Sequence, residues 1–404
     1  MADIVVIGAG PAGLAAAIAA SEKGRKVTVL DRNQWLGGIL PQCIHDGFGV
    51  LEKGVSLTGP EYAGQYIKKA RERGVDIRSS TMVLELEAGK GKNRVRAIGP
   101  GGIMELRPRA IILATGCRER TRWAAMIPGT RPSGIYTAGV AQAMINLYNR
   151  AVGRKVVILG SGNVGLIMAR RMTLEGAEVK GVVEIMPYAT GLPRNVVQCL
   201  EDYNIPLHLS HTITNIKGRS RLTGITMAKV DKDMKPIQRT EMDVECDTLL
   251  LSLGLVPENE LAKALGVEMD PLTGGPRVDQ DMETSIDGVY ACGNCLHVHD
   301  TVDMLTEEAA LAGRSASSIT IHRPEGARLI PGRNVSYVVP QWVHGPGKVI
   351  VSLRAKRPME SGAVLSIAGE RKRLACAVPS TMIREEIEVT NDMLEGDMEA
   401  DLIA

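Results

Sequence analysis

The 404-residue chain has few aromatic side chains, which make up 3% of its residues, and a net charge of only +2. Nucleic-acid-binding proteins combine a basic surface with aromatic rings that stack on bases, so both shortages argue against that class. No apolar run is long enough to span a bilayer, and the run over 14–20 is far too short. We therefore expect no nucleic-acid partner and no membrane span.

The seven cysteines are odd in number and irregularly spaced, which favours a reducing compartment. The first residues lack the basic region and cleavage site of a signal peptide, so we expect a cytoplasmic protein. Cys292 and Cys295 form a C-x-x-C pair, for which a redox role and a buried structural role both stay open. Because no second pair stands at ligand spacing, we expect no metal site.

Two glycine-rich loops are the most informative segments that the chain does contain. Each follows a β-branched run, reads G-x-G-x-x-G and opens a helical segment; the glycines are Gly8, Gly10, Gly13 and Gly160, Gly162, Gly165. In such a loop the first glycine permits a tight turn and the third allows close helix–strand packing. The second lets backbone N–H groups approach a diphosphate at the helix N-terminus. Two loops in one chain predict one flavin and one nicotinamide dinucleotide.

An acidic residue is expected about 20 positions after each loop, where it would accept hydrogen bonds from ribose hydroxyls. Asp31 and Glu184 stand at the ends of the next apolar strands. Glu184 would repel a 2′-phosphate, and no arginine follows it within 185–188. The second loop therefore favours NADH over NADPH.

The pattern along the chain predicts an α/β fold with two Rossmann-like three-layer domains and a small C-terminal β module. We expect an FAD domain over 1–118 and 255–325, with an NAD(P) domain over 119–254 inserted in it. Residues 75–112 predict a β-meander, and a helix is expected from about Thr301 to Ile319. Residues 326–404 predict a separate β-rich module, whose acidic tail from Met393 onward we expect to fray.

The order of these segments resembles the two-dinucleotide-binding-domain flavoproteins, which include thioredoxin reductase and the pyridine nucleotide–disulfide oxidoreductases. The resemblance covers about residues 1–320. It rests on the motif order GAGPAG, Gly37-Gly38, Ala114-Thr115-Gly116, GSGNVG, Gly254 and the strand Val289–Asn294. Residues 37–49 and 292–300 are similar to one subunit of two-subunit NADH oxidases and dye-linked dehydrogenases. Such subunits work beside a second flavoprotein that resembles glycerol-3-phosphate dehydrogenase.

The resemblance implies roles by position. Asn294 stands where the superfamily usually has an aspartate that binds the ribityl chain of FAD, so one negative charge is lost. The FAD contacts implied by position are Gly8, Gly10, Pro11, Ala12, Gly13, Asp31, Arg32, Gly38, Val83, Ala114, Thr115, Gly116, Gly293, Asn294, Asp300 and Thr301. The NAD contacts are Gly160, Gly162, Asn163, Val164, Gly165 and Glu184.

Catalytic candidates are Cys43, His45 and His299. Cys43 is the only cysteine just after the Gly-Gly turn in the sequence, so a dithiol relay is not expected. Cys43 is either a lone thiol near the flavin or a buried residue that packs like a small apolar side chain. The histidines are proton donors if they lie near the flavin, or structural groups if they do not. We expect an enzyme that passes hydride from NADH to flavin. The alternative is an electron-relay subunit of a larger dehydrogenase.

Overall fold

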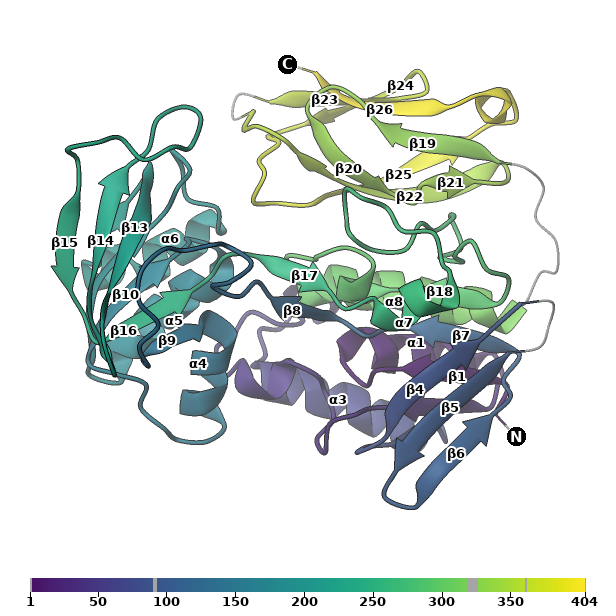
Figure 1. Cartoon of the computed structure of the whole chain (residues 1–404). Helices are drawn as coiled ribbons and strands as arrows, with labels where there is room; N and C mark the ends of the chain where they lie inside the picture. Colours follow the sequence, from purple (N-terminus) through teal and green to yellow (C-terminus); the bar gives the residue numbers. More distant parts are fainter. Residues whose placement is uncertain (1, 90–92, 319–325, 360–361, 404) are drawn as a thin grey trace. The chain divides into compact units, whose positions relative to one another are not determined.

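The computed structural model describes residues 2–89, 93–318, 326–359 and 362–403. The chain divides into two compact units, of which the first contains Met1–Cys117 and Pro257–Ala404 and the second Arg118–Val256 (Figure 1). The second unit is thus inserted between two parts of the first. Residues 90–92 of the predicted meander, the helix end at Ile319 and the domain boundary at 325 lie outside the described residues.

A five-stranded parallel sheet forms the centre of the first unit. Its order is β18 (Val289–Ala291), β7 (Ala110–Leu113), β1 (Ile4–Ile7), β2 (Val27–Leu30) and β3 (Asp76–Arg78). Strands β1, β2, β7 and β18 are buried along their whole length. Parallel strands covered on both faces are continuous apolar runs, which is why these segments show no polar alternation.

Helices and an antiparallel sheet complete the Rossmann-like part of the first unit. The helices are α1 (Pro11–Glu22), α2 (Val50–Lys53), α3 (Gly59–Glu72), α7 (Glu260–Leu265) and α8 (Val302–Ser318), with 3₁₀ turns η1 (Leu40–Gln42) and η3 (Gly293–Cys295). The antiparallel strands are β4 (Met82–Glu87), β5 (Arg94–Gly99) and β6 (Gly102–Leu106). The predicted meander is therefore confined to these three strands, because β3 pairs with β2 in the parallel sheet.

The second unit repeats this plan. Its parallel sheet is β12 (Leu207–His208), β11 (Glu178–Val183), β10 (Lys155–Leu159), β16 (Thr248–Leu251) and β9 (Ile135–Thr137). Its other elements are helices α4 (Ala138–Asn146), α5 (Asn163–Leu174) and α6 (Pro193–Cys199), turn η2 (Glu201–Tyr203) and antiparallel strands β13 (His211–Gly218), β14 (Leu222–Lys229) and β15 (Met242–Glu245).

Strand β10 shows how its sequence builds three layers. Val156 and Ile158 pack in the cluster that contains the helices α4 and α5, whereas Val157 and Leu159 pack with residues of β13 and β14. Successive strand residues point to opposite faces, so a fully apolar strand serves two cores at once. Strands β8 (Cys117–Glu119) and β17 (Leu255–Pro257) pair where the chain passes between the units.

The C-terminal residues form two sheets around a core of their own (Figure 1). One sheet is β21 (Trp342–Val343), β19 (Ala327–Pro331), β26 (Met398–Ile403), β23 (Ala363–Ile367) and β24 (Glu370–Leu374). The other is β20 (Val335–Val339), β22 (Gly347–Ala355) and β25 (Ile383–Val389), and turn η4 (Asp392–Glu395) precedes β26. The predicted fold class, two parallel-sheet nucleotide-binding units with a small β module, is confirmed.

The prediction that the tail frays from Met393 onward was wrong. Strand β26 lies between β19 and β23, and its alternate residues Met398, Ala400 and Leu402 are buried. The acidic residues that suggested fraying occupy the intervening positions, so a strand pattern of period two was overlooked. Among the described residues, no helix combines the length and apolar character needed to cross a membrane.

Candidate functional site

The first glycine loop joins β1 to α1. Gly8 has φ +108°, and a Cβ there would lie 2.3 Å from the Ala114 carbonyl oxygen. A Cβ on Gly13 would lie 1.8 Å from the carbonyl oxygen of Gly8. The fold itself therefore requires glycine at both positions, as predicted for a tight turn and for close helix packing.

Gly10 differs from its two neighbours in the loop. Its φ of −71° and ψ of −179° suit any residue, and the nearest atom to an added Cβ, the Cα of Gly38, is 3.9 Å away. Nothing among the described residues explains why this residue is glycine. A ligand that approaches the backbone closely would explain it, as would a diphosphate at the N-terminus of α1, where Pro11 occupies the first turn.

The second loop shows the same division between β10 and α5. Gly160 has φ +99°, and a Cβ added to it would lie 2.0 Å from the Ser252 carbonyl oxygen. A Cβ added to Gly165 would lie 2.5 Å from the carbonyl oxygen of Gly160. Gly162 has ordinary angles, φ −63° and ψ 162°, and only the Ser252 hydroxyl lies near its virtual Cβ, at 3.4 Å. In both loops, the second glycine is thus the one at which the described residues leave space for a side chain.

The two predicted acids are also equivalent. The Asp31 carboxylate accepts from the Ala9 amide at 2.7 Å, and the Glu184 carboxylate accepts from the Ser161 amide at 2.9 Å. Each acid thereby joins the end of its strand to the residue between the first two glycines. Both are buried, and each also accepts from an amide two residues further along the chain. Their contacts to ribose stay predictions.

Several other predicted FAD contacts converge on the first loop. Gly38 backs onto Gly10, and a Cβ on Gly293 would lie 2.6 Å from that of Ala12, so the Gly-Gly turn and η3 both border the start of α1. Ala114 donates to the Ile7 carbonyl oxygen at 3.0 Å, and the next two residues, Thr115 and Gly116, bond to Glu258. Thr301, next to α8, has a buried hydroxyl without a partner among the described residues. The open space beside the backbone of Gly10 and the unpaired hydroxyl of Thr301 both fit a bound dinucleotide.

Three predicted FAD contacts have other partners. Val83 lies in β4 and packs in the hydrophobic core. Arg32 pairs with Glu258 at 2.9 Å. The Asp300 carboxylate accepts from Arg354 at 2.9 Å and from the Met382 amide at 2.5 Å, so the C-terminal strands hold the loop before α8. Asn163, a predicted NAD contact, accepts from the amide of Leu192 and the side chain of Asn195, while Val164 lies half-buried beside it.

His299 lies in a buried cluster with His297 and Glu308. The Nε2 atoms of the two histidines lie 3.3 and 2.7 Å from the same oxygen of Glu308, and the three side chains are at most 5% exposed. Burial raises the pKa of the Glu308 carboxyl, but the attraction of both histidines outweighs it and holds the pKa below its ordinary value. Burial lowers the pKa of His297. Ligand atoms of these residues all lie within 4.8 Å of one another. His297 Nε2 forms a hydrogen bond with Glu308, whereas the Nε2 atom of His299 has no hydrogen-bond partner among the described residues.

The other catalytic candidates are separate from this cluster. His45 bonds through Nδ1 with the Asp46 carbonyl oxygen and packs on Phe48; among the described residues, no hydrogen bond or ring contact joins it to His299. The Cys43 thiol donates to the Ile39 carbonyl oxygen, and burial raises its pKa to about 12, so it is protonated at neutral pH. Cys292 and Cys295 are fully buried free thiols, which fits the structural role better than the redox role.

The sequence interpretation missed Glu308, Glu258, Ser252 and Arg354. Glu308 carried one detectable signal, a carboxylate on the buried face of α8. No sequence signal pointed to Arg354, because its partner Asp300 is 54 residues away.

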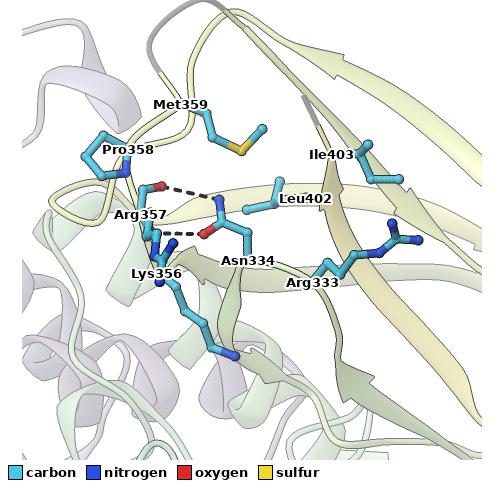
Figure 2. A pocket seen from close by; sticks show the side chains of 8 residues that line it. All are labelled: Arg333, Asn334, Lys356, Arg357, Pro358, Met359, Leu402 and Ile403. Carbon is cyan, nitrogen blue, oxygen red and sulfur yellow. Dashed lines mark hydrogen bonds between the residues drawn. The ribbon is translucent and has the colours of Figure 1, made fainter.

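A cavity of about 600 Å³ in the C-terminal module lies apart from these loops. Asn334 bridges both backbone groups of Arg357 beside it, and the side chains of Arg333 and Lys356 extend in different directions (Figure 2).

Comparison with known proteins agrees with this geometry. The family model described as pyridine nucleotide-disulphide oxidoreductase matches residues 2–315. The chain is similar to a subunit of the opine oxidase of Agrobacterium tumefaciens, with 27% identity over 72% of this chain and 61% of that protein. It is also similar to an NADH oxidase of Methanocaldococcus jannaschii, with 26% identity over 76% of this chain and 65% of that protein. The chain therefore spans less than two thirds of the length of these relatives.

A solved structure supports the fold. The thioredoxin reductase of T. acidophilum superposes with a TM-score of 0.65 and 24% identity, over 78% of this chain and 98% of that chain. At this identity the likeness shows the fold alone. The match of the family model over residues 2–315 confirms the predicted resemblance to this group of flavoproteins.

Proposed function

Because the chain belongs to the pyridine nucleotide-disulphide oxidoreductase family, we propose that it is an FAD-dependent NADH oxidoreductase. In this proposal the first unit binds FAD at the loop of Gly10, and the second binds NADH at the loop of Gly162. NADH reduces the flavin, and the electrons then pass to an acceptor or to a partner flavoprotein.

One observation carries the proposal: Gly10 and Gly162 are glycines that the fold does not need. Their neighbours in both loops have positive φ or would clash with backbone oxygens, whereas these two have ordinary angles and open space. Both precede a helix, and the N-terminus of a helix is electropositive. A ligand diphosphate that contacts the backbone supplies the missing reason in each unit.

The protein's own residues bind and orient. The loop amides and helix N-termini would hold each diphosphate, and Asp31 and Glu184 keep the loops in shape through Ala9 and Ser161. Glu184 also disfavours a 2′-phosphate, because its carboxylate would repel that charge. When bound, FAD supplies the hydride-accepting chemistry that no side chain has. The next cysteine after Cys43 in the sequence is Cys117, so we infer that the acceptor is not a disulfide relayed through this chain.

Anaerobic addition of NADH to the purified chain tests the proposal. We expect yellow protein whose absorbance near 450 nm bleaches with NADH and bleaches less readily with NADPH. Colourless protein that cannot be reconstituted with FAD would contradict the FAD site. Yellow protein that millimolar NADH does not bleach would contradict the NADH site alone.

A second candidate function is an electron-relay subunit. Its support is that relatives are named as subunits, among them the opine oxidase relative of Agrobacterium tumefaciens. Large apolar side chains also lie exposed near the Gly-Gly turn, including Trp35 (45% exposed), Ile39 (56%) and Leu51 (66%), and such patches are typical of protein contacts. An isolated chain that oxidises NADH with steady turnover, as a monomer or homodimer, would argue against an obligate partner.

A further inference from the structure

One ring nitrogen of His299 faces a carboxylate without a hydrogen bond between them. Its Nε2 atom lies 3.3 Å from Glu308 Oε2, yet it has no hydrogen-bond partner among the described residues. The side chain of His299 is 2% exposed and that of Glu308 is 5% exposed, so bulk water does not reach this contact. A buried polar atom without a partner costs free energy, and a bound group that supplies one would remove this cost.

The other ring nitrogen of His299 indicates which tautomer the ring adopts. A backbone N–H can only donate, so the Asn294 atom that accepts from the His299 amide at 3.0 Å is the side-chain oxygen. The same oxygen lies 3.3 Å from His299 Nδ1, which therefore carries a hydrogen and donates to it. In this tautomer Nε2 has a lone pair, and that lone pair faces an oxygen of Glu308. A cation between the two atoms would satisfy both.

His297 completes a set of three ligands. Its Nε2 atom donates to the same oxygen of Glu308 at 2.7 Å, and ligand atoms of all three residues lie within 4.8 Å of one another. Because a metal binds deprotonated nitrogen, an ion would displace this proton to Nδ1 of His297, a buried atom without a partner among the described residues. Two imidazoles and one carboxylate are a ligand set that proteins use for zinc and for iron(II).

The distance between His299 Nε2 and Glu308 Oε2 favours a metal ion over a bridging water. An ion at the usual zinc distance of about 2.05 Å from two atoms that are 3.3 Å apart subtends roughly 107° between them, close to the tetrahedral angle. A water at about 2.8 Å from both would subtend only about 72°, too narrow for two good hydrogen bonds. The two imidazole ligands argue against Ca²⁺ and Mg²⁺, which prefer oxygen.

Neighbouring groups hold two of the ligands in place. The Gly293 amide donates to Glu308 Oε1 at 3.2 Å, which leaves Oε2 turned toward the histidines. The Asn294 oxygen fixes the tautomer and orientation of His299. Hydrogen bonds of this kind to a carboxylate and to the second nitrogen of an imidazole are typical of groups that support metal ligands.

The C-terminal module places no unpaired cation beside the cluster among the described residues. Tyr337 packs its ring edge against His297, with the ring centroids 5.7 Å apart, and its hydroxyl is buried without a described partner. Arg354 is paired with Asp300 at 2.9 Å, so its charge is already balanced. The carboxylate of Glu308 therefore remains available to a positive ion.

We propose that His297, His299 and Glu308 bind one divalent transition-metal ion of the zinc class. The ion would tie the turn after β18 to helix α8 and so stabilise the first unit, and a water would fill the fourth position that three protein ligands leave. The expectation of no metal site considered cysteine pairs and did not weigh histidines with a carboxylate from the next helix. The inference goes beyond the proposed function and does not depend on it.

Zinc titration of the whole chain, freed of metal with a chelator and dialysed, tests the proposal. Calorimetry at pH 7.5 with zinc chloride should show one ion per chain with a Kd of about 1 μM or below, and saturation should raise the melting temperature by about 5 °C. His299→Gln should weaken binding roughly 100-fold and abolish this rise. His211→Gln, which alters another histidine pair with ring centroids 5.8 Å apart, should bind zinc as the wild type does.

X-ray absorption by the zinc-loaded wild type identifies the ligands without any variant, so the result stands even if His299→Gln folds poorly. We expect only nitrogen and oxygen neighbours at about 2.0–2.1 Å, with the scattering pattern of imidazole, and no sulfur near 2.3 Å. A sulfur neighbour would mean an adventitious ion on the cysteines and would overturn the proposal. Undetectable zinc binding, or equal binding by a folded His299→Gln, would overturn it as well. Bleaching by NADH tests the proposed function separately.

Discussion

Replacement of Gly162 by alanine adds one methyl group where the folded protein has room for it. The nearest atom is the Ser252 hydroxyl at 3.4 Å, and φ of −63° is ordinary for alanine. A compatible Gly→Ala change stabilises a protein by about 0.4–1 kcal/mol, because it restricts the unfolded chain. We therefore expect the melting temperature of Gly162→Ala to equal or slightly exceed that of the wild type.

The same methyl group would stand where the diphosphate of NADH approaches the backbone. Loss of one or two hydrogen bonds to a charged group costs about 1.5–3 kcal/mol, which corresponds to roughly 10- to 100-fold weaker binding. Stopped-flow bleaching of the flavin at increasing NADH should show this increase in the half-saturating concentration. The yellow colour should remain, because the FAD loop is unchanged.

Gly165→Ala is the matched control in the same loop. Its Cβ would lie 2.5 Å from the Gly160 carbonyl oxygen and 2.8 Å from Ser252 Cβ, so it should destabilise the second unit by about 1–3 kcal/mol. Thermal unfolding should separate the two variants clearly. If Gly162→Ala bound NADH as tightly as the wild type, or lost as much stability as Gly165→Ala, the argument from glycine geometry would be refuted.

Three further outcomes are expected. Burial raises the pKa of Glu283 to about 7. Its contribution to the free energy of unfolding is therefore greatest below the unfolded-state pKa near 4.5, and on the order of 3 kcal/mol of it is lost as the pH rises to 7. Urea unfolding of Glu283→Gln should show a free energy of unfolding that depends less on pH over that range. Arg354→Met should lower the free energy of unfolding by about 3 kcal/mol, because it removes the cation that pairs with the Asp300 carboxylate. Adding Asp300→Asn should restore part of this loss, whereas additive losses in the double variant would contradict the pairing. Cys376 is exposed and should react first with a thiol reagent, and NADH should not increase the number of reactive thiols; an NADH-dependent increase would reveal a redox-active cysteine pair.

The two glycine loops were readable from the sequence because their signals are local. A β-branched strand, three glycines at set spacing and an acid at the end of the next strand all lie within about 30 residues, and the same short-range geometry appears in the structure. The open space at Gly10 and Gly162 was not readable, since it depends on the distance to Gly38 and Ser252. Only the folded chain distinguishes glycines that the turn needs from glycines that a ligand needs.

His299 was noticed in the sequence as a catalytic candidate, but its partners were not. His299 was predicted as either a proton donor to flavin or a structural group, and the structure places it beside Asn294 and Glu308. The acidic tail misled for a related reason, because charged residues at alternate positions of β26 hide a buried strand. In both cases the missing information was which face of an element is covered.

The sequence by itself therefore determined the fold class, the two glycine loops and the family to which they point, because periodicity and turn geometry act between near neighbours. Tertiary structure alone decided that Glu308 would lie beneath His299 and that Arg354 would hold Asp300 from a strand 54 residues away. The protonation and direction of a buried polar group depend on what packs against it, and long-range packing leaves no periodic trace in the chain.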